Sequence, residues 1–588
     1  MPASRILSSG RARSWRPLAV LALTTAIPAC SDWVPPAPPP VGAIPAYPDP
    51  PASSARVEPG AAFAALRDRL VDQFLADDPS LGRGAGLHQY DGKVGAYSAQ
   101  AIKARIERLE QARADLAAVD EAALSPDDRL DRALLRSRVD LALFQLVELE
   151  EWRRRPKFYD ELFSVDAYLE RDYAPVAERA AHLLAHEEAA LAEIPNIRKN
   201  LVSPLSRPVV ETAVKSFKGY ATYLRTDLTK MLKGVGTPAF QEKLQKTNEA
   251  LAAAAQDLAD HLAKVELPKS DASHVLGPER YKKLLRVQEG LEVSLADFKK
   301  MGEENLAENK KAYEALLKKK AAVTRTKAKE LFGDATRLTD ASRRFLIDKH
   351  IVTVPTDEKA VVKESPPFMR WNSAFLDAPG PFEAKPLDAF YYITQPDPSW
   401  PKKEQLEYLP TRGVLLSTTV HEVYPGHFLQ GLWVKRAPTR VQKLFSSYSF
   451  VEGWAHYGEQ MMIEEGFGAA DPESRLGQLS DALLRNCRVV VSLGIHAEGM
   501  TIEQAQKRFM DDCKQDKATA REQAARGAFD PGYFAYTLGK IQILALREEA
   551  KKKLGAKFSL QRFHDALLAH GSPPVPLIRE RVLSDLAR

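Results

Sequence analysis

The sequence contains little cysteine and only a small excess of positive charge. It has three cysteines in 588 residues, too few for a disulfide-dense scaffold, and its 45% hydrophobic residues exclude an intrinsically disordered chain. The formal charge is +5, from 83 Lys and Arg against 78 Asp and Glu. Because a basic balance can indicate an anionic partner such as nucleic acid, the position of the excess has to be known.

Most of the positive excess lies in residues 1–29. This segment contains Arg5, Arg11, Arg13 and Arg16 and no acid, so its removal lowers the formal charge from +5 to +1. An apolar stretch at 18–27 follows the arginines, too short to span a bilayer. The pattern is typical of a secretion signal, so we expect an exported protein in the periplasm or cell envelope and no nucleic-acid partner.

A second processing feature follows the apolar stretch. The residues Ile27-Pro28-Ala29-Cys30 resemble a bacterial lipobox, in which Cys30 would carry a lipid; the alternative is a plain secretion signal cut near Ala29. The segment 34–51 holds nine prolines, which predicts an extended tether over 30–57. No later segment is long and apolar enough to cross a membrane, so we expect membrane contact only through the lipid anchor.

The rest of the chain, 58–588, has mainly helical periodicity. Apolar residues recur at spacings of three and four, as in Ile102, Ile106 and Leu109, and prolines such as Pro195 suggest breaks between helices. The lysine-rich stretch 299–329 also contains glutamates, which favours a solvated helix face over a nucleic-acid patch. We predict one mainly α domain, with a helical half at 58–345 and a catalytic half at 346–588.

Two short runs near 350–395 differ from the helical pattern. Residues 351–354 and 389–394 (AFYYIT) are rich in β-branched and aromatic side chains and predict a small sheet or hairpin. AFYYIT could pair with an extended substrate as an edge strand. Cys487 and Cys513, the two cysteines of the catalytic half, could form a disulfide or remain separate buried thiols, and the spacing leaves both alternatives open.

The segment HEVYPGH supplies residues suited to a zinc site. Zinc binds imidazole nitrogen and carboxylate oxygen, and a neighbouring glutamate can accept a proton from water at the metal. His421 and His427 are candidate ligands, and Glu422 is the candidate base. The histidines are six residues apart, which a regular helix would place on different faces. Pro425 and Gly426 predict a bulge or kink that brings them together.

A second segment, EGWAHYGE, supplies the third ligand. Glu452, His456 and Glu459 occur at i, i+4 and i+7, on one face of a predicted helix. Burying two carboxylates and an imidazole on one face is costly without a cation or a hydrogen-bond network. We therefore predict Glu452 as the third ligand of a single Zn²⁺ per chain, with His456 or Glu459 supporting the ligands.

These motifs resemble those of known metallopeptidases. HExYPGHxLQ, EGWAxY, LGxHxxG and PGxxxxYxxGxxxI resemble a bacterial family called domain of unknown function 885. The arrangement is also similar to the gluzincin clan that contains neurolysin, angiotensin-converting enzyme and the Taq carboxypeptidase. The resemblance implies a mostly helical fold that encloses a channel with zinc at its floor.

The resemblance also implies roles for residues beyond the zinc ligands. A helix predicted from Pro531 carries Tyr533 and Tyr536, and in the related peptidases such tyrosines contact the substrate and stabilise the oxyanion, roles that fall here on Tyr533 and Tyr536 respectively. Three further positions match the family, and their cations could hold the carboxylate of a peptide. These three are Arg488, His496 and Arg526.

The predicted activity is zinc-dependent hydrolysis of short peptides by an exported enzyme. Zinc would polarise the carbonyl group and the water, Glu422 would move the proton, and Tyr536 would support the oxyanion. One alternative is hydrolysis of a non-peptide amide or ester at the same metal, because the ligands do not define the acyl group. The other is an envelope binding protein with a vestigial site.

Overall fold

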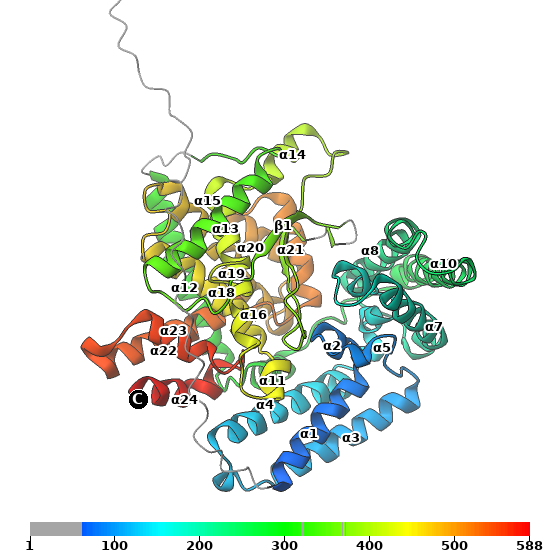
Figure 1. Ribbon diagram of the computed structural model, residues 1–588. Helices are drawn as coiled ribbons and strands as arrows, with labels where there is room; N and C mark the ends of the chain where they lie inside the picture. The colour runs from blue at the N-terminus through cyan, green and yellow to red at the C-terminus, as the bar shows by residue number, and fades with distance from the viewer. Residues whose placement is uncertain (1–60, 319–322, 367–368, 371) are drawn as a thin grey trace, which may run out of the picture. The chain divides into compact units, whose positions relative to one another are not determined.

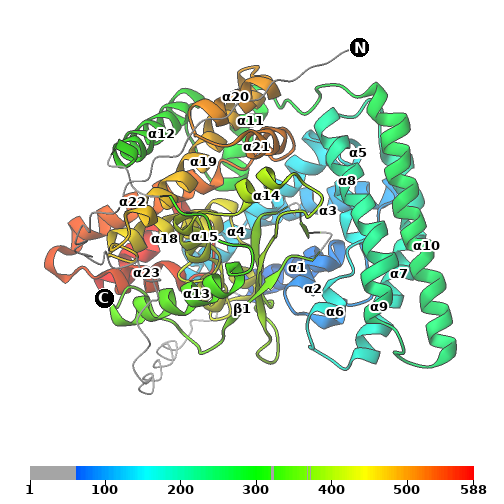
Figure 2. The same cartoon turned by 90° about the horizontal axis from the view of Figure 1, so that it is seen from above.

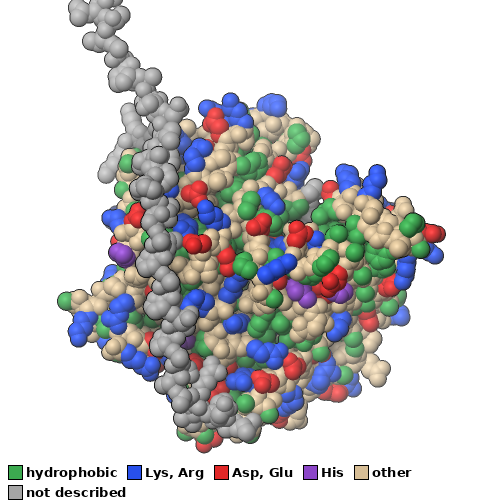
Figure 3. All heavy atoms as spheres, viewed as in Figure 1, with side chains coloured by type: hydrophobic (Ala, Val, Ile, Leu, Met, Phe, Trp, Pro, Cys, Tyr) green, Lys and Arg blue, Asp and Glu red, His purple; other side chains and the backbone are tan. Residues whose placement is uncertain are grey.

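A computed structural model describes residues 61–318, 323–366, 369–370 and 372–588 (Figure 1). The predicted signal, Cys30 and the tether lie outside the described residues. The described residues belong to one compact unit. It is mainly helical with a small three-stranded sheet, which confirms the predicted mainly α class. None of the described helices is long and apolar enough to cross a bilayer. Basic and acidic side chains alternate over the face shown in Figure 3.

The first helices begin at the capping residues that their sequence supplies. The Ser98 side chain accepts a hydrogen bond from the Ala101 amide, and Ser125 does the same for Asp128. Both caps satisfy amides at a helix start that have no partner within the helix. The elements of this part are α1 (Ala61–Asp77), α2 (Pro79–Gly84), α3 (Ala99–Ala117), α4 (Pro126–Leu143), α5 (Glu151–Arg154) and α6 (Ala167–Glu170).

The next group of long helices has a hydrophobic core of its own. Buried Leu183, Phe217 and Leu251 belong to this core, which is separate from the larger core around the sheet. The long helices α7, α8 and α10 run side by side in Figure 2. The group consists of α7 (Val176–Asn200), α8 (Arg207–Tyr223), α9 (Thr229–Met231) and α10 (Pro238–His261).

Pro195 does not end a helix, contrary to the prediction from its position. It lies inside α7, which continues to Asn200. Proline removes one hydrogen bond of the helix ladder, but burial of Leu183 and Ile197 on either side holds the helix against its neighbours. Tertiary packing therefore outweighs the local preference at this position.

The lysine-rich stretch is helical up to Lys318, and lysines of this helix pair with acids. The Lys299 ammonium lies 2.9 Å from a carboxylate oxygen of Glu498, and Lys310 lies 2.9 Å from Asp512. This arrangement is the solvated helix face that the alternating charges indicate. The helices of this region are α11 (Pro278–Glu289), α12 (Leu295–Lys318) and α13 (Leu331–Asp348).

The sheet contains β1 (Ala360–Glu364), β2 (Ala374–Asp377) and β3 (Ala389–Ile393), in the order β1–β3–β2. β1 pairs with β3 in parallel, and β2 pairs with β3 antiparallel. β3 lies in the middle of the sheet and is buried along its whole length. AFYYIT is thus the central strand, and the prediction that it pairs with a substrate as an edge strand is wrong, because β1 and β2 take both of its edges.

The run at 351–354 is not a strand, although its composition suggests one. The backbone amide and the hydroxyl of Thr353 donate to the Asp565 carboxylate, at 2.9 and 2.6 Å. The Ile351 carbonyl accepts a hydrogen bond from His564 at 2.7 Å. These side chains satisfy backbone groups that a neighbouring strand would otherwise bind.

The C-terminal helices surround the candidate site. α18 and α22 pack with their backbones in contact, because a Cβ atom on Gly453 of α18 would lie only 2.4 Å from the Gly539 Cα atom of α22. A side chain at either glycine would force the two helices apart. The helices are α14 (Lys402–Tyr408), α15 (Arg412–Glu422), α16 (His427–Val434), α17 (Arg440–Leu444), α18 (Tyr448–Glu464), α19 (Pro472–Ala497), α20 (Ile502–Asp511), α21 (Lys517–Phe529), α22 (Ala535–Leu554), α23 (Leu560–Leu568) and α24 (Val575–Ala587).

Cys487 and Cys513 form a disulfide. Cys487 lies on α19 and Cys513 follows α20, and their Cα atoms are 6.2 Å apart. Both residues are fully buried in a small apolar cluster with Phe509. Of the two alternatives that the sequence leaves open, the structure has the paired form.

We expect removal of this disulfide to destabilise the protein. The bond closes a loop with a sequence separation of 26, for which the chain-entropy estimate is about 3.5 kcal/mol. The double variant Cys487→Ser/Cys513→Ser should lose about this much unfolding free energy in urea titrations. Wild-type protein under a reducing agent should match the variant, and the variant itself should not respond to the reductant. Equal stability of oxidised wild type and the variant would contradict this expectation.

Candidate metal centre

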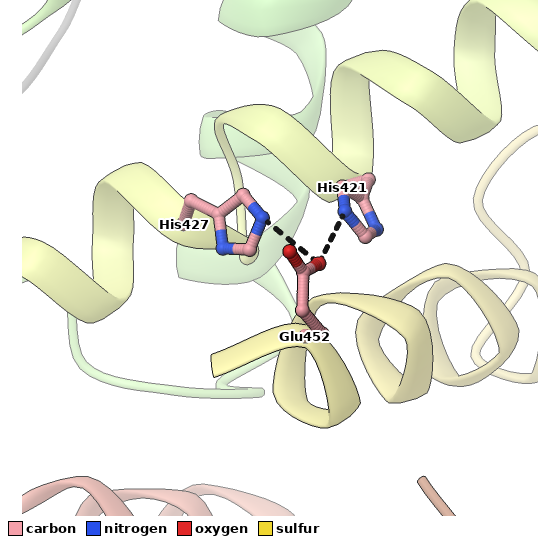
Figure 4. Close-up of side chains that lie close together, drawn as sticks. All are labelled: His421, His427 and Glu452. Carbon is pink, nitrogen blue, oxygen red and sulfur yellow. Dashed lines mark ion pairs between the residues drawn. The ribbon is translucent and has the colours of Figure 1, made fainter. Parts of the chain in front are cut away.

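The helix that carries His421 ends one residue later, and a new helix begins at His427. α15 ends at Glu422 and α16 starts at His427, with a four-residue turn at 423–426 between them. The sequence predicts a kink within one helix, whereas the structure has two helices. The change of direction places the two imidazole ring centroids 4.7 Å apart, at an angle of 82° (Figure 4). The six-residue spacing is thus compatible with binding one ion.

Gly426 makes this turn sterically possible. Its amide donates a hydrogen bond to the Val420 carbonyl at 3.0 Å, which folds the turn back onto the end of α15. A Cβ atom at position 426 would lie 1.7 Å from the His421 carbonyl oxygen. Any other residue would therefore push His427 away from His421.

Glu452, on α18, completes a set of three potential ligands. Its Oε2 atom lies 3.3 Å from His421 Nε2 and 3.4 Å from His427 Nε2, and the three ligand atoms all lie within 4.8 Å of one another (Figure 4). Atoms bound tetrahedrally to zinc at about 2.0–2.1 Å are about 3.3–3.4 Å apart. The donor types and both measured distances therefore fit a zinc ion.

The electrostatics of Glu452 also fit a bound cation. Its Oε2 atom is buried, and its partners among the described residues are the Nε2 atoms of His421 and His427. Burial alone would raise the pKa of Glu452, but the charges of His427 and His421 hold it well below its usual range. A buried carboxylate is costly without a positive partner, and a metal ion would supply one.

Glu459 supports His421 from the side opposite the ligands. Its Oε1 atom accepts a hydrogen bond of 2.7 Å from His421 Nδ1, which leaves Nε2 free to bind a metal. Glu459 also lies 3.0 Å from Arg485 and 3.2 Å from His456 Nδ1. Burial would raise the pKa of Glu459, but Arg485 and His456 lower it strongly, so the carboxylate stays charged. The structure thus links both predicted supporting residues, Glu459 directly and His456 through Glu459.

We expect the affinity for zinc to fall with decreasing pH. Burial and Arg485 act to lower the pKa of His421, but Glu452 and Glu459 raise it to about 9 in the metal-free protein. Because zinc binds the neutral imidazole, binding below pH 9 must release this proton, which costs about tenfold in affinity for each pH unit. Competition with a chelator, corrected for the chelator's own protonation, should show about a 100-fold loss between pH 8 and pH 6.

A matched variant tests the cause of this pH dependence. Glu459→Gln removes one of the two carboxylates that raise the pKa of His421. The variant should release the metal less steeply as the pH falls, although its affinity at pH 8 should drop about 10- to 100-fold through loss of the supporting hydrogen bond. An affinity of the wild type that does not change between pH 6 and pH 8 would contradict the assignment.

The predicted base lies beside the ligands. Glu422 follows His421 directly and is buried at the end of α15. Its carboxylate is close enough to β3 that, together with burial, it raises the pKa of Tyr391. Glu422 thus adjoins the candidate ligand His421 in sequence, and its carboxylate lies within electrostatic range of Tyr391 on β3.

The two predicted tyrosines lie in different surroundings. Tyr536, on α22, stacks beside His421 with 6.2 Å between ring centroids and 14° between ring planes. Tyr533 precedes α22, so the prediction of one helix that carries both tyrosines is wrong: the helix starts at Ala535 rather than Pro531. Tyr533 is fully buried in the apolar cluster around the disulfide. The structure therefore brings Tyr536, but not Tyr533, into ring contact with a ligand.

The three predicted cationic residues also lie in different surroundings. The Arg488 and Arg526 guanidinium carbons lie 4.3 and 5.9 Å from the centroid of the Tyr536 ring. His496 is fully buried and its Nε2 atom lies 2.7 Å from the Gly527 carbonyl oxygen, while burial lowers its pKa to about 4. His496 thus serves the packing of α19 against α21, and the structure does not bring it to the ligands.

Sequence analysis missed four residues of the site. Arg485 and Asp481 lie one and two turns before Arg488 on α19, and Arg485 pairs with Glu459. Lys540 follows Tyr536 by one turn and is 1% exposed, and burial lowers its pKa to about 8. A charged residue inside an apolar helical stripe is a signal that could have found both Arg485 and Lys540.

Tyr448 is the fourth missed residue. Its ring contacts the edge of Tyr536 with 6.0 Å between centroids, and its hydroxyl accepts a hydrogen bond of 2.8 Å from Arg526. It precedes Glu452 by four residues on α18, and this spacing places both side chains on the same helix face.

Fold and site together define a mainly helical protein with a potential three-ligand metal centre. The chain belongs to a family of bacterial proteins of unknown function (DUF885), whose family model matches residues 79–582. No curated protein matches the chain.

Two solved structures share the fold. One, from Shewanella oneidensis, is 23% identical with a TM-score of 0.72 and covers 89% of this chain and 99% of its own. The other, from Colwellia psychrerythraea, is 19% identical with a TM-score of 0.73 and covers 90% of this chain and 99% of its own. Both carry the description "putative lipoprotein", and the first is further described as of unknown function.

Proposed function

We propose that the protein is a zinc-dependent peptidase that hydrolyses short peptides. The observation that carries this proposal is the convergence of His421, His427 and Glu452, with both imidazole Nε2 atoms 3.3–3.4 Å from Glu452 Oε2 and with Glu422 next to His421 in sequence. When bound, zinc would act as a Lewis acid toward the carbonyl group and the attacking water. One ion per chain would satisfy the three donors.

Residues of the chain would transfer the proton, stabilise the oxyanion and orient the ligands. Glu422 accepts the proton of the attacking water and delivers it to the leaving amine. The hydroxyl of Tyr536 donates a hydrogen bond to the developing oxyanion. Glu459 holds the His421 ring in the tautomer and orientation that binding requires, and Arg485 keeps Glu459 charged and in place.

The proposal includes a relationship to the gluzincin peptidases and a location in the cell envelope. The first rests on the sequence motifs and on the ligand set of two histidines and one glutamate. The second rests on the predicted signal and lipobox, and on the lipoprotein description of the two similar structures. We further propose that membrane contact is limited to a lipid on Cys30.

Hydrolysis of a short-peptide library, followed by mass spectrometry, tests this function. Metal-loaded protein should cleave peptides, and chelation should abolish cleavage until zinc is restored. Cleavage of esters without any cleavage of peptides would replace the proposal with a non-peptide hydrolase. Absence of hydrolysis, with less than about a tenth of a zinc per chain after mild purification, would favour the binding protein with a vestigial site.

A further inference from the structure

A carboxylate at the end of α11 binds the start of α18, the helix that carries Glu452. Glu289 is the last residue of α11 and is fully buried. Its Oε2 atom accepts hydrogen bonds from the Ser447 hydroxyl at 2.8 Å, from the Ser449 amide at 3.2 Å and from the Ser449 hydroxyl. Because Ser447 caps α18 and Ser449 lies in its first turn, one oxygen atom holds the helix start at three points.

The other oxygen atom of Glu289 is bound as well. Gln288 Nε2 donates a hydrogen bond to Glu289 Oε1 at 2.9 Å. The same amide nitrogen lies against Gly532, where a Cβ atom would come within 2.7 Å of it. Gly532 lies in the turn that leads to α22 and Tyr536. The carboxylate is therefore fixed on both of its oxygens, next to the starts of two helices of the site.

α11 is itself anchored against the helices around the metal centre. Its buried residues Tyr281 and Leu285 share an apolar cluster with Phe534, which precedes α22. The Tyr281 hydroxyl lies 2.9 Å from the Ser492 hydroxyl on α19. α11 thus offers a firm support from which Glu289 reaches α18.

The orientation of α18 about its own axis needs such a support. Contact between Gly453 and Gly539 prevents sliding of α18 along α22, but glycine has no side chain that would resist rotation. An atom about 5–6 Å from a helix axis moves about 1 Å when the helix rotates by about 10°. Metal–ligand distances tolerate deviations of only about 0.2 Å. A small rotation of α18 would therefore displace Glu452 from His421 and His427.

We infer that Glu289 is a positioning residue of the metal centre. It acts through the start of α18, whose orientation it fixes, and so sets the place of Glu452 relative to the two imidazoles. The inference rests on the proposed function, because it takes the three converging side chains as metal ligands. It adds that the geometry of the ligands depends on a side chain 158 positions before Ser447 in the sequence.

Removal of this carboxylate should weaken zinc binding. Glu289→Met keeps the approximate volume of the side chain but removes the acceptor, and its zinc affinity in chelator competition at pH 8 should fall about 10-fold. Glu289→Gln keeps one acceptor oxygen for the serines and should recover most of the affinity. With Co²⁺ as the probe, the visible absorption per bound ion reports the ligand geometry and should change in Glu289→Met.

A matched control separates this effect from a general loss of stability. Glu161 accepts hydrogen bonds from the Gly95 amide at 2.9 Å and from the Tyr97 hydroxyl, outside the metal centre. Glu161→Met makes the same chemical change there. It should lower the urea midpoint but keep the zinc affinity within about twofold of the wild type, with an unchanged Co²⁺ spectrum. Wild-type affinity in Glu289→Met, or an equal loss of affinity in both variants, would overturn the inference.

A milder variant decides the question if Glu289→Met does not fold. Ser449→Ala removes one of the three donors to Oε2 and should lower the zinc affinity about threefold, with a smaller change in the Co²⁺ spectrum. An unchanged affinity and spectrum would contradict the positioning role.

The positioning role and the peptidase activity can fail separately. Weaker zinc binding by Glu289→Met, without peptide hydrolysis by the wild type, would support the role of Glu289 and reject the peptidase. Hydrolysis by the wild type, with no effect of Glu289→Met on zinc affinity, would do the reverse. A wild type that binds no zinc would overturn both.

Discussion

Glu422→Gln should reduce peptide hydrolysis by about 10³- to 10⁴-fold while the protein keeps its zinc. The substitution preserves the shape of the side chain but removes the carboxylate that accepts the proton of the attacking water, and general base catalysis contributes up to this magnitude. Glu422 is not one of the three converging ligands, so the metal content should stay near one ion per chain. Initial rates on the peptide library and elemental analysis of the same sample measure both quantities.

A matched control separates this effect from a general loss of structure. Glu465 follows the end of α18, outside the metal centre, and Glu465→Gln makes the same chemical change there. The control variant should keep its activity within about twofold. Activity of Glu422→Gln at the wild-type level would reject Glu422 as the base and, with it, the proposed mechanism.

His427→Ala should weaken zinc binding by at least about 100-fold. Zinc sites with four protein ligands bind with about 10–16 kcal/mol, so a single ligand contributes roughly 3 kcal/mol, which is more than 100-fold in affinity. His427 is well suited to this test, because its side chain is 17% exposed. Replacing it with alanine leaves a smaller cavity than the same replacement of a fully buried residue. Chelator competition gives the affinity, and activity should fall in parallel at limiting zinc.

The control for this prediction is His261→Ala, a substitution on α10 outside the metal centre. It should bind zinc like the wild type. Retention of full zinc affinity by His427→Ala would remove His427 from the ligand set. Only the distance between Glu452 Oε2 and His421 Nε2 would then support a zinc site.

The helical class and the three side chains that converge could be predicted from the sequence because both depend on local patterns. Apolar spacing of three and four residues defines helices. The pairing of His421 with Glu422, and the i and i+7 spacing of Glu452 and Glu459, are visible in short segments. The geometry at 423–426 could not be predicted in detail, because it depends on how the turn packs against the end of α15.

Contacts between distant segments account for the errors and omissions. The position of AFYYIT inside the sheet depends on β1 and β2, whose own sequences do not specify their partner. The link from Glu459 to His421 joins residues 38 positions apart, and Arg485 reaches Glu459 from a third helix. A single sequence shows which charged residues lie in apolar stripes, but not which of them meet.

The backbone contact between Gly453 and Gly539 has a consequence for motion. Gly453 adjoins the candidate ligand Glu452 on α18, and Gly539 lies three residues after Tyr536 on α22. The two glycines therefore hold α18 in direct contact with α22 next to these side chains. Helices in such close contact cannot slide past one another without a clash. Glu452 and Tyr536 are therefore held at a fixed separation. Any opening that admits a peptide has to come from other segments, such as the group α7–α10, whose separate core lets it shift as a unit.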